Sequence, residues 1–249
     1  IRRPPRSTLD RSSAASDVYK RQDLGSRVYT SRLIGSVPDL VMHGGGNTSC
    51  KSHTKNIFNE YIEVICVKGS GWDLETIEAK GLPSIKLAPL LELRKLKKLS
   101  DENMVNLQRA NLLDSQSPNP SVETLLHAFL PHKFVDHTHA TPFLILANLP
   151  NYNKIVDEIF GSKLAVVPYI MPGFDLAKKA AEKTAIIIKE TLERFENHRA
   201  QATKTASGLR YFISKKGDGP SVTKIRTKCN KKGRRKWHAK RATLLMRPI

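Results

Sequence analysis

The sequence predicts an α/β fold, because short apolar runs alternate with longer amphipathic segments along its central part. The clearest apolar run is YIEVICVK at 61–68, whose β-branched residues suit a buried strand. The clearest amphipathic segment is APLLELRKLKKL at 88–99, which has helical spacing of its leucines. Glycine-rich turns separate such segments, so a layered α/β domain is expected, with a sheet that need not be parallel.

The first half of this domain begins with a helix. Residues 23–35 (DLGSRVYTSRLIG) carry apolar side chains near helical spacing. LVMH at 40–43 predicts a short strand, and the glycine-rich stretch GGGNTSCK at 44–51 follows it. After the 61–68 strand, KGSGWDL at 68–74 predicts a turn broken by glycine.

Two capped helices open the second half. Ser100 is expected to cap a helix over 101–111 (DENMVNLQRAN), and Ser121 to cap a helix introduced by proline within 117–131 (SPNPSVETLLHAFLP). KFVDHTHA at 133–140 predicts a strand. Two later segments complete the alternation: a strand over 163–170 (KLAVVPYI) and a long helix over 174–201.

The strand predicted at 133–140 contains two histidines with one residue between them. Because side chains alternate faces along a strand, His137 and His139 should point the same way. Two imidazoles on one rigid face can hold one metal ion, and zinc is the usual ion for nitrogen donors. The alternative is a pair of surface histidines on a polar strand face.

Three segments carry groups that can surround an anion. The glycines of GGGNTSCK leave backbone N–H groups free, and Asn47, Thr48 and Ser49 add side-chain donors. Ser70 and Gly71 lie in a second such turn, and Ser121 at a helix N-terminus adds a third set of donors. Each segment alone is also consistent with an ordinary turn or an ordinary helix cap.

Glu123 lies in the first turn of the helix that Ser121 is expected to cap. A carboxylate there interacts favourably with the helix N-terminus, which is its simplest role. Beside a phosphate site and a metal it would be well placed to move a proton from carbon. His127, one turn later, is expected to pack in the helix or pair with Glu123.

The charge of the chain is concentrated at its ends. The formal net charge of the 249 residues is +19, yet residues 1–22 hold six Arg or Lys against two Asp, and residues 215–249 hold thirteen against one. The central part is therefore nearly balanced, and nucleic-acid binding is expected only non-specifically, through the basic tail. No apolar run reaches transmembrane length, and the three cysteines lack metal-type spacing, so a cytoplasmic protein is expected.

The two ends differ from the centre in kind as well as in charge. The opening 1–22 resembles a translated sequencing adaptor and is expected to be disordered, so it is excluded from the fold. Residues 205–220 (TASGLRYFISKKGDGP) resemble the opening of an FKBP-type peptidyl-prolyl isomerase domain. The expected organisation is a disordered 1–22, a domain over 23–200 and a basic, irregular tail over 201–249.

Five motifs in the centre, taken together and in order, resemble the class II aldolase/adducin family. They are HGGGNTS, VKGSGWDLETIE, PLLELRKL, SPNPSVETLLHAFLPHKFVDHTHA and VVPYIMPGFDLAKKAAE. The resemblance covers about residues 23–182 and is closest to the aldolase part of bifunctional rhamnulose-1-phosphate aldolase/alcohol dehydrogenases. It implies a three-layer α/β/α domain with a central, mainly antiparallel sheet that is incomplete at its C-terminal end.

The resemblance also implies a site, residue by residue. The positions that match the family's phosphate-binding loops are Gly46, Asn47, Ser70, Gly71 and Ser121. Glu123 matches the acid/base carboxylate, which approaches the metal when substrate is absent, and His137 and His139 match two zinc ligands. The implied cofactor is one Zn²⁺ per subunit, and the implied substrate is a small phosphorylated sugar.

The sequence departs from the family pattern after Lys183. The family's third zinc histidine lies on a later strand, usually before glycine, and AIIIKETLERFENHRAQ contains no such pair. His198 sits in a charged helical context and is expected to be solvated. The match also lacks the branch's dehydrogenase module, so no NAD site is expected in these residues.

These features lead to three alternative functions. The first is a zinc-dependent class II aldolase domain that cleaves a ketose 1-phosphate to dihydroxyacetone phosphate and an aldehyde, impaired by loss of the third ligand. The second is a non-catalytic, adducin-like binding module, and the third is a nucleic-acid binder that uses the basic tail. The first also implies a homo-oligomer, as in the parent family, with no membrane association.

Overall fold

The computed structural model describes the backbone of residues 8–201, 203–204, 210–211 and 243–246, and the side chains of 22–161 and 163–197. Its α-helices are α1 (Thr8–Gly35), α2 (Leu87–Glu92), α3 (Asp101–Ala110), α4 (Thr124–Phe129), α5 (Thr141–Asn148), α6 (Tyr152–Phe160) and α7 (Phe174–Gln201). Its strands are β1 (Asn47–Lys55), β2 (Tyr61–Val67), β3 (Ser84–Lys86), β4 (Phe134–His137), β5 (Leu164–Val167), β6 (Thr203–Lys204), β7 (Arg210–Tyr211) and β8 (Thr243–Met246). Short 3₁₀ turns lie at Ala79–Gly81, Leu93–Lys95 and Gly161–Lys163.

A four-stranded sheet in the order β3-β2-β1-β4 forms the centre of the domain, and all its pairs are antiparallel. The hairpin of β1 and β2 runs from Ser49 opposite Val67 to Lys55 opposite Tyr61. β4 pairs with the start of β1, so His137 lies opposite Asn47. The expectation of an α/β domain with a mainly antiparallel sheet is confirmed.

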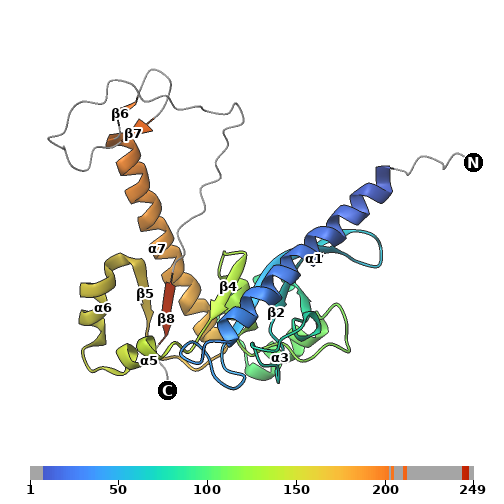
Figure 1. Cartoon of the computed structure of the whole chain (residues 1–249), viewed down its shortest axis with the longest axis horizontal. Helices are drawn as coiled ribbons and strands as arrows, with labels where there is room; N and C mark the ends of the chain where they lie inside the picture. The colour runs from blue at the N-terminus through green and yellow to red at the C-terminus, as the bar shows by residue number, and fades with distance from the viewer. Residues whose placement is uncertain (1–7, 202, 205–209, 212–242, 247–249) are drawn as a thin grey trace, which may run out of the picture.

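Helices cover both faces of this sheet, which gives the expected three layers (Figure 1). The alternation along β2 decides which side chain enters which core. Val64 and Cys66 face a cluster under α1, whereas Ile65 and Val67 face a larger cluster under α2, α4 and α7. Each fully buried aliphatic side chain in these clusters stabilises the fold by about 1.5–3 kcal/mol relative to exposure.

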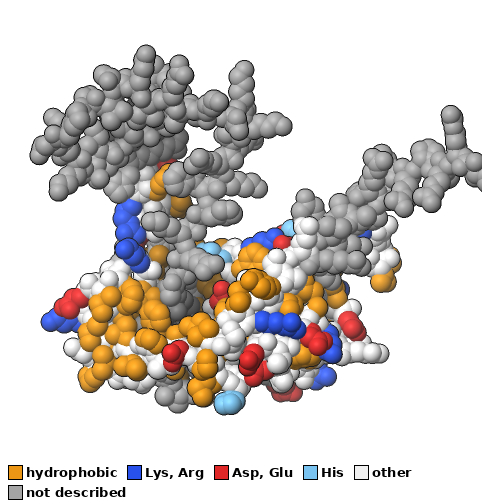
Figure 2. Space-filling model, in the orientation of Figure 1, with side chains coloured by type: hydrophobic (Ala, Val, Ile, Leu, Met, Phe, Trp, Pro, Cys, Tyr) orange, Lys and Arg blue, Asp and Glu red, His pale blue; other side chains and the backbone are white. Residues whose placement is uncertain are grey.

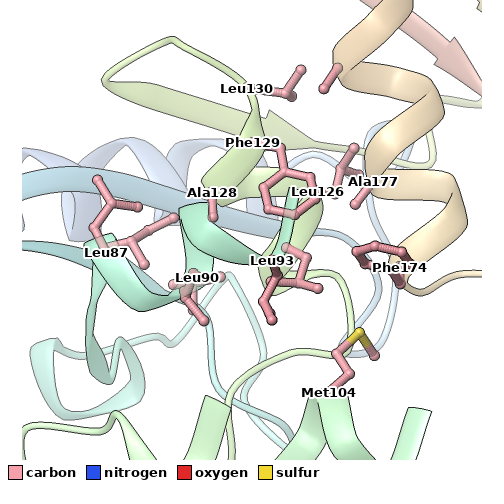
Figure 3. Close-up of a cluster of buried hydrophobic side chains, with 14 of the residues drawn as sticks. Leu87, Leu90, Leu93, Met104, Leu126, Ala128, Phe129, Leu130, Phe174 and Ala177 are labelled. Atoms are coloured by element: carbon pink, nitrogen blue, oxygen red, sulfur yellow. The ribbon is translucent and has the colours of Figure 1, made fainter. Parts of the chain in front are cut away.

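The larger cluster fixes α4 against the start of α7 (Figure 3). Phe129 of α4 meets Phe174 of α7 edge to face, with ring centroids 6.5 Å apart. Leu90 and Met104 fill the space between these helices and the preceding ones. This packing holds the segment before α4 against the sheet, and Glu123 lies in that segment.

A second group of elements, β5, β8, α5 and α6, lies beside the central sheet (Figure 1). β5 pairs in parallel with β8, and α5 and α6 pack next to it around Ala147, Val156 and Leu164. Apolar side chains gather on the surface of this part, where Ile145 and Ile159 are exposed (Figure 2). Its open cavity of about 680 Å³, between α6, β5 and α7, lies apart from all the predicted site residues.

Several helix predictions are confirmed in kind and corrected in extent. α3 begins as expected, with the Ser100 Oγ accepting from the Asn103 N–H at 3.3 Å, and α7 spans the predicted range. α1 begins at Thr8 rather than at 23, so the backbone of 8–22 continues the first helix. The helix expected over 88–99 is only α2 followed by a 3₁₀ turn at Leu93–Lys95.

The strand predicted at 40–43 is wrong. His43 has φ 41°, Gly44 has φ 72° and Gly46 has φ 64°, and these left-handed conformations break any extended run there. The strand begins at Asn47 instead, so the glycines precede a strand rather than follow one. α5 and α6 were not predicted, although Thr-Pro at the start of α5 is a common helix entrance.

The capping contact predicted for Ser121 is present, since its Oγ accepts from the Glu123 N–H at 3.2 Å, but the helix starts later than predicted. Pro120 forms a bridge with Gly69 and Ser121 N–H donates to the Lys68 carbonyl, so the chain is held beside the end of β2 at this point. The helix therefore starts only at Thr124, with Glu123 in the capping position. Ser121 and Glu123 lie in the approach to a six-residue helix, not in its first turn.

Candidate active site

Three segments far apart in the sequence meet at one end of the sheet. The Lys68 N–H donates to the Thr48 carbonyl at 3.0 Å, which joins the end of β2 to the start of β1. The Ser70 N–H donates to the Asn119 carbonyl at 2.8 Å, which joins the turn after β2 to the segment before α4. The glycine loop, the KGSG turn and the Ser121 segment are therefore neighbours, as a shared phosphate site requires.

Gly46 is where the glycine loop approaches the histidine strand. It adopts φ 64°, and a Cβ at this position would lie 2.6 Å from the His137 carbonyl oxygen. Real Cβ atoms do not come so close to backbone, so only glycine fits without displacement. Gly46 thereby sets the distance between the start of β1 and the end of β4.

Asn47 connects the three segments through its side chain. Its Nδ2 donates to the Glu123 Oε2 at 2.5 Å and to the Ser121 Oγ at 3.3 Å. Its Oδ1 contacts the His127 Nε2. Asn47 is almost fully buried at 6% exposure, so its amide is held in place rather than solvated.

Glu123 is the carboxylate at the centre of the site. Its Oε2 lies 2.7 Å from the His137 Nδ1 as well as within reach of the Asn47 amide. Burial raises the pKa of Glu123, but the close contact with His137, together with the Asn47 amide, lowers that pKa by more, to about 2. Glu123 is therefore a carboxylate at neutral pH, so it would begin a reaction as a proton acceptor.

The two histidines of the HxH motif lie side by side. Their ring centroids are 4.9 Å apart and the rings are tilted by 57°. β4 ends at His137, and the chain continues to His139, whose N–H donates to the Leu40 carbonyl at 2.8 Å. The motif therefore straddles the end of a strand, whereas the sequence predicted a strand through both residues.

The type of donor at this site fits zinc, but the number does not. The His137 Nδ1 is buried and forms no hydrogen bond of good geometry with any described residue. Its near neighbour is the Glu123 Oε2, at 2.7 Å. An imidazole nitrogen held in this way is suited to a metal ion. However, no three His, Cys, Asp or Glu side chains in the described part of the chain form a metal-binding group.

The turn after β2 contributes two predicted residues. Ser70 and Gly71 are both exposed, and Gly71 has φ 82° with nothing within 4 Å of where a Cβ would lie. Glycine is thus required at 71 by its backbone conformation and not by crowding. The turn is open to solvent beside the Ser121 segment.

Sequence reasoning missed two cations that hold the site together. The Lys68 Nζ donates to the Gly44 carbonyl at 2.7 Å, and burial lowers the pKa of this lysine. The Arg27 guanidinium of α1 is 1% exposed and lies 2.6 Å from the Asp136 carboxylate, next to His137. A lysine that ends an apolar strand just before glycine was a usable signal for the first, whereas an arginine on an amphipathic helix gives no such signal.

His127 was expected to pack or to pair with Glu123, and it is packed, with 0% exposure and side-chain partners other than Glu123. The His127 Nδ1 lies 2.8 Å from the Ser49 Oγ, and its Nε2 contacts the Asn47 Oδ1. His198 belongs to α7, but its side chain lies outside the described residues. Most of the FKBP-like stretch and of the basic tail also lies outside them.

The fold is an α/β domain with an antiparallel sheet, and one end of that sheet holds a carboxylate and two histidines. These two features together define the class of domain. The chain belongs to the Class II Aldolase and Adducin N-terminal domain family, whose model matches residues 27–197. Within the described residues, no helix is long and apolar enough to cross a membrane.

Two known proteins are similar to this chain. The first, named "Uncharacterized oxidoreductase YuxG", is from Bacillus subtilis (strain 168) and is 43% identical over 171 residues. That match covers 69% of this chain and only 25% of the relative. The second is the N-terminal Class II Aldolase domain of a conserved protein from Thermoplasma acidophilum, with 39% identity and a TM-score of 0.60. Its structural match covers 73% of this chain and 78% of that one.

Proposed function

We propose that this domain is built for retro-aldol cleavage of a ketose 1-phosphate of the rhamnulose-1-phosphate type, giving dihydroxyacetone phosphate and an aldehyde. Family membership supports a lyase-type enzyme. The observation that carries the proposal is the position of Glu123, an ionised carboxylate held by Asn47 and His137 where three loop segments meet. A carboxylate so fixed is suited to proton transfer at carbon.

The chemistry assigned to Glu123 follows from the bond that breaks. Cleavage separates the dihydroxyacetone phosphate half from the hydroxyl-bearing carbon that becomes the aldehyde. As the carbon–carbon bond breaks, the hydroxyl on the carbon that becomes the aldehyde loses its proton to the ionised Glu123, and the electron pair stays on the dihydroxyacetone phosphate half as an enediolate. The carbon that carries this electron pair then takes up a proton from Glu123, which returns to its ionised state. Glu123 moves this proton in either direction, while Asn47 limits the freedom of its carboxylate.

His137 and His139 are the residues that would hold the ion, and zinc bound there would polarise the substrate carbonyl and stabilise the enediolate. Glu123 cannot be a permanent ligand and a free base at once. Because the described residues supply no further ligand, we expect weak zinc binding and little turnover from this chain.

The phosphate of the substrate is assigned to Gly46, Asn47, Ser70, Gly71 and Ser121. A phosphate needs several donors at once, and these residues come from the three segments that hydrogen bonds join. Asn47 and Ser121 are already in contact at 3.3 Å, whereas Ser70 and Gly71 lie in the exposed turn beside them. The proposal also includes a cytoplasmic homo-oligomer, with nucleic acid bound only non-specifically by the basic tail.

A non-catalytic, adducin-like binding module is the second candidate. One observation favours it, namely that the described side chains form no three-donor metal group. The retained Glu123, His137 and His139 favour catalytic ancestry, because a pure binding module need not keep them together.

The test is a cleavage assay with zinc and rhamnulose-1-phosphate, using a coupled enzyme that detects dihydroxyacetone phosphate. The expected result is a low rate that disappears in Glu123→Gln and is unchanged in Glu63→Gln. Glu63 is a matched control, because it lies on β2 as an exposed partner of His53 at 3.4 Å. Turnover that survives Glu123→Gln would refute the role of Glu123, and complete inactivity with phosphate still bound would favour the binding module.

A further inference from the structure

His127 is a buried histidine that the proposed chemistry does not use. It has 0% exposure, in the middle of α4, and both ring nitrogens have polar neighbours. A buried imidazole that only filled space would be replaceable by an apolar ring of similar size. The two contacts instead place His127 in a chain of groups that runs from Ser49 through Asn47 to Glu123.

The direction of each hydrogen bond in this series of side chains can be worked out by starting from Glu123. The Asn47 atom nearest Glu123 is the amide nitrogen, which lies 2.5 Å from the Glu123 Oε2 and 3.3 Å from the Ser121 Oγ, and an amide nitrogen can only donate. The amide oxygen of Asn47 then faces the His127 Nε2 and must receive a proton from it. Burial lowers the pKa of His127 to about 3, so the ring is neutral and its Nδ1 is left to accept the Ser49 hydroxyl proton at 2.8 Å.

The reverse arrangement conflicts with the same contacts. If Nδ1 carried the proton, Nε2 would need a donor, and the Asn47 amide would have to turn its nitrogen toward His127. Its oxygen would then face both the Glu123 carboxylate and the Ser121 hydroxyl. Two acceptors 2.5 Å apart repel each other strongly, so this arrangement is excluded while Glu123 is ionised.

We propose that His127 is a positioning residue, whose neutral Nε2–H tautomer fixes the Asn47 amide so that its two N–H groups point at Glu123 and Ser121. Glu123 thereby keeps one oriented donor, and the donor side of Asn47 faces the loops assigned to phosphate. The purpose of this positioning role rests on the proposed function, because it concerns the orientation of Glu123. The tautomer of His127 can nevertheless be measured without any turnover.

The first measurement is the tautomer in the intact chain, by ¹⁵N NMR of the histidine rings at neutral pH. His127 is assigned as the ring that disappears in His127→Gln. The expected spectrum has a protonated Nε2 and an unprotonated Nδ1. An Nδ1–H tautomer, or two protonated nitrogens, would overturn the proposal whatever the cleavage assay gives.

The second measurement follows the Asn47 side-chain amide in His127→Phe. Its two amide protons should lose their protection from exchange by about tenfold or more, because nothing then holds the oxygen side. His127→Gln offers an N–H to Asn47 and should restore most of the protection. The control is the Asn111 amide in the C-cap position of α3, which donates to the Leu107 carbonyl at 2.9 Å and should not change. Unchanged protection of Asn47 in His127→Phe would overturn the proposal.

These measurements separate the two claims. If cleavage is never detected but His127 is the Nε2–H tautomer and Asn47 responds as expected, the proposed function fails and the positioning role stands. If Glu123→Gln abolishes cleavage while the His127 ring is in another state, the positioning role fails alone. Should His127→Phe not fold, as the Asn111 signal would show, the tautomer of the unaltered chain decides the matter.

Discussion

Lys51 should be among the most costly polar side chains to remove from this domain. Its Nζ donates to three backbone carbonyls at the end of α4 and just beyond it, those of His127 (2.9 Å), Leu130 (2.6 Å) and His132 (2.9 Å). A helix of six residues ends there, so these carbonyls have few other partners. The change to test is Lys51→Met, which keeps most of the unbranched side chain and removes the donor.

The magnitude follows from two opposing effects. Three hydrogen bonds from a charged donor contribute about 1.5–3 kcal/mol each, or about 5–9 kcal/mol together. Burial lowers the pKa of Lys51 from 10.5 to about 8, and a difference of this size corresponds to about 3 kcal/mol lost in burying the charge. Lys51→Met should therefore lower the free energy of unfolding by about 2–6 kcal/mol.

The assay is urea unfolding followed by circular dichroism, with Lys80→Met as the control. Lys80 forms an exposed ion pair with Glu78 at 3.0 Å, and its removal should cost less than about 1 kcal/mol. The reasoning is refuted if Lys51→Met unfolds at the same urea concentration as Lys80→Met.

The pH dependence gives an independent check on Lys51. Between about pH 8 and 10.5 the unfolded chain holds a proton on this lysine that the folded chain has released. Stability due to Lys51 therefore rises with pH across this window, since the unfolded state binds more protons. The difference between the unaltered chain and Lys51→Met should show this rise, and a difference that falls with pH would contradict the burial argument.

Two further substitutions test the contacts that shape the site. Gly46→Ala should lower the free energy of unfolding by about 2–4 kcal/mol, because it combines φ 64° with a Cβ 2.6 Å from the His137 carbonyl oxygen. The control is Gly25→Ala, at an exposed position of α1 with free space, which should be neutral or slightly stabilising. Equal effects of the two changes in urea unfolding would contradict this. Arg27→Met should lower the free energy of unfolding by about 2–4 kcal/mol, because it leaves Asp136 without its partner at 2.6 Å. Adding Asp136→Asn to this variant should recover part of the lost stability. Full additivity of the two changes in urea unfolding would show that the two residues are not coupled.

The parts of the fold that the sequence predicts well are those set by periodic burial. Successive side chains of YIEVICVK alternate between the two hydrophobic clusters, and β2 spans Tyr61–Val67 as expected. The Ser100 cap and α7 follow from equally local signals. LVMH failed because a run of four apolar or aromatic residues carries no information about the left-handed backbone that begins at His43.

The candidate site was predictable in composition and only partly in arrangement. Motif order indicated that Asn47, Ser121 and Glu123 belong to one place, and their side chains are in contact. The start of α4 was misplaced because the bridge between Gly69 and Pro120 is a long-range contact that no local pattern encodes. The same holds for His127, whose partners Ser49 and Asn47 are about 80 residues away in the sequence.

Zinc titration by calorimetry is the measurement that tests the central claim most directly. The claim is that His137 and His139 form the two-histidine part of a metal site beside Glu123. The account predicts weak one-to-one binding that is lost in His137→Ala and in His139→Ala and is retained in His53→Ala, whose exposed histidine is the matched control. Zinc binding that is unaffected by either substitution in the HxH motif would contradict the account.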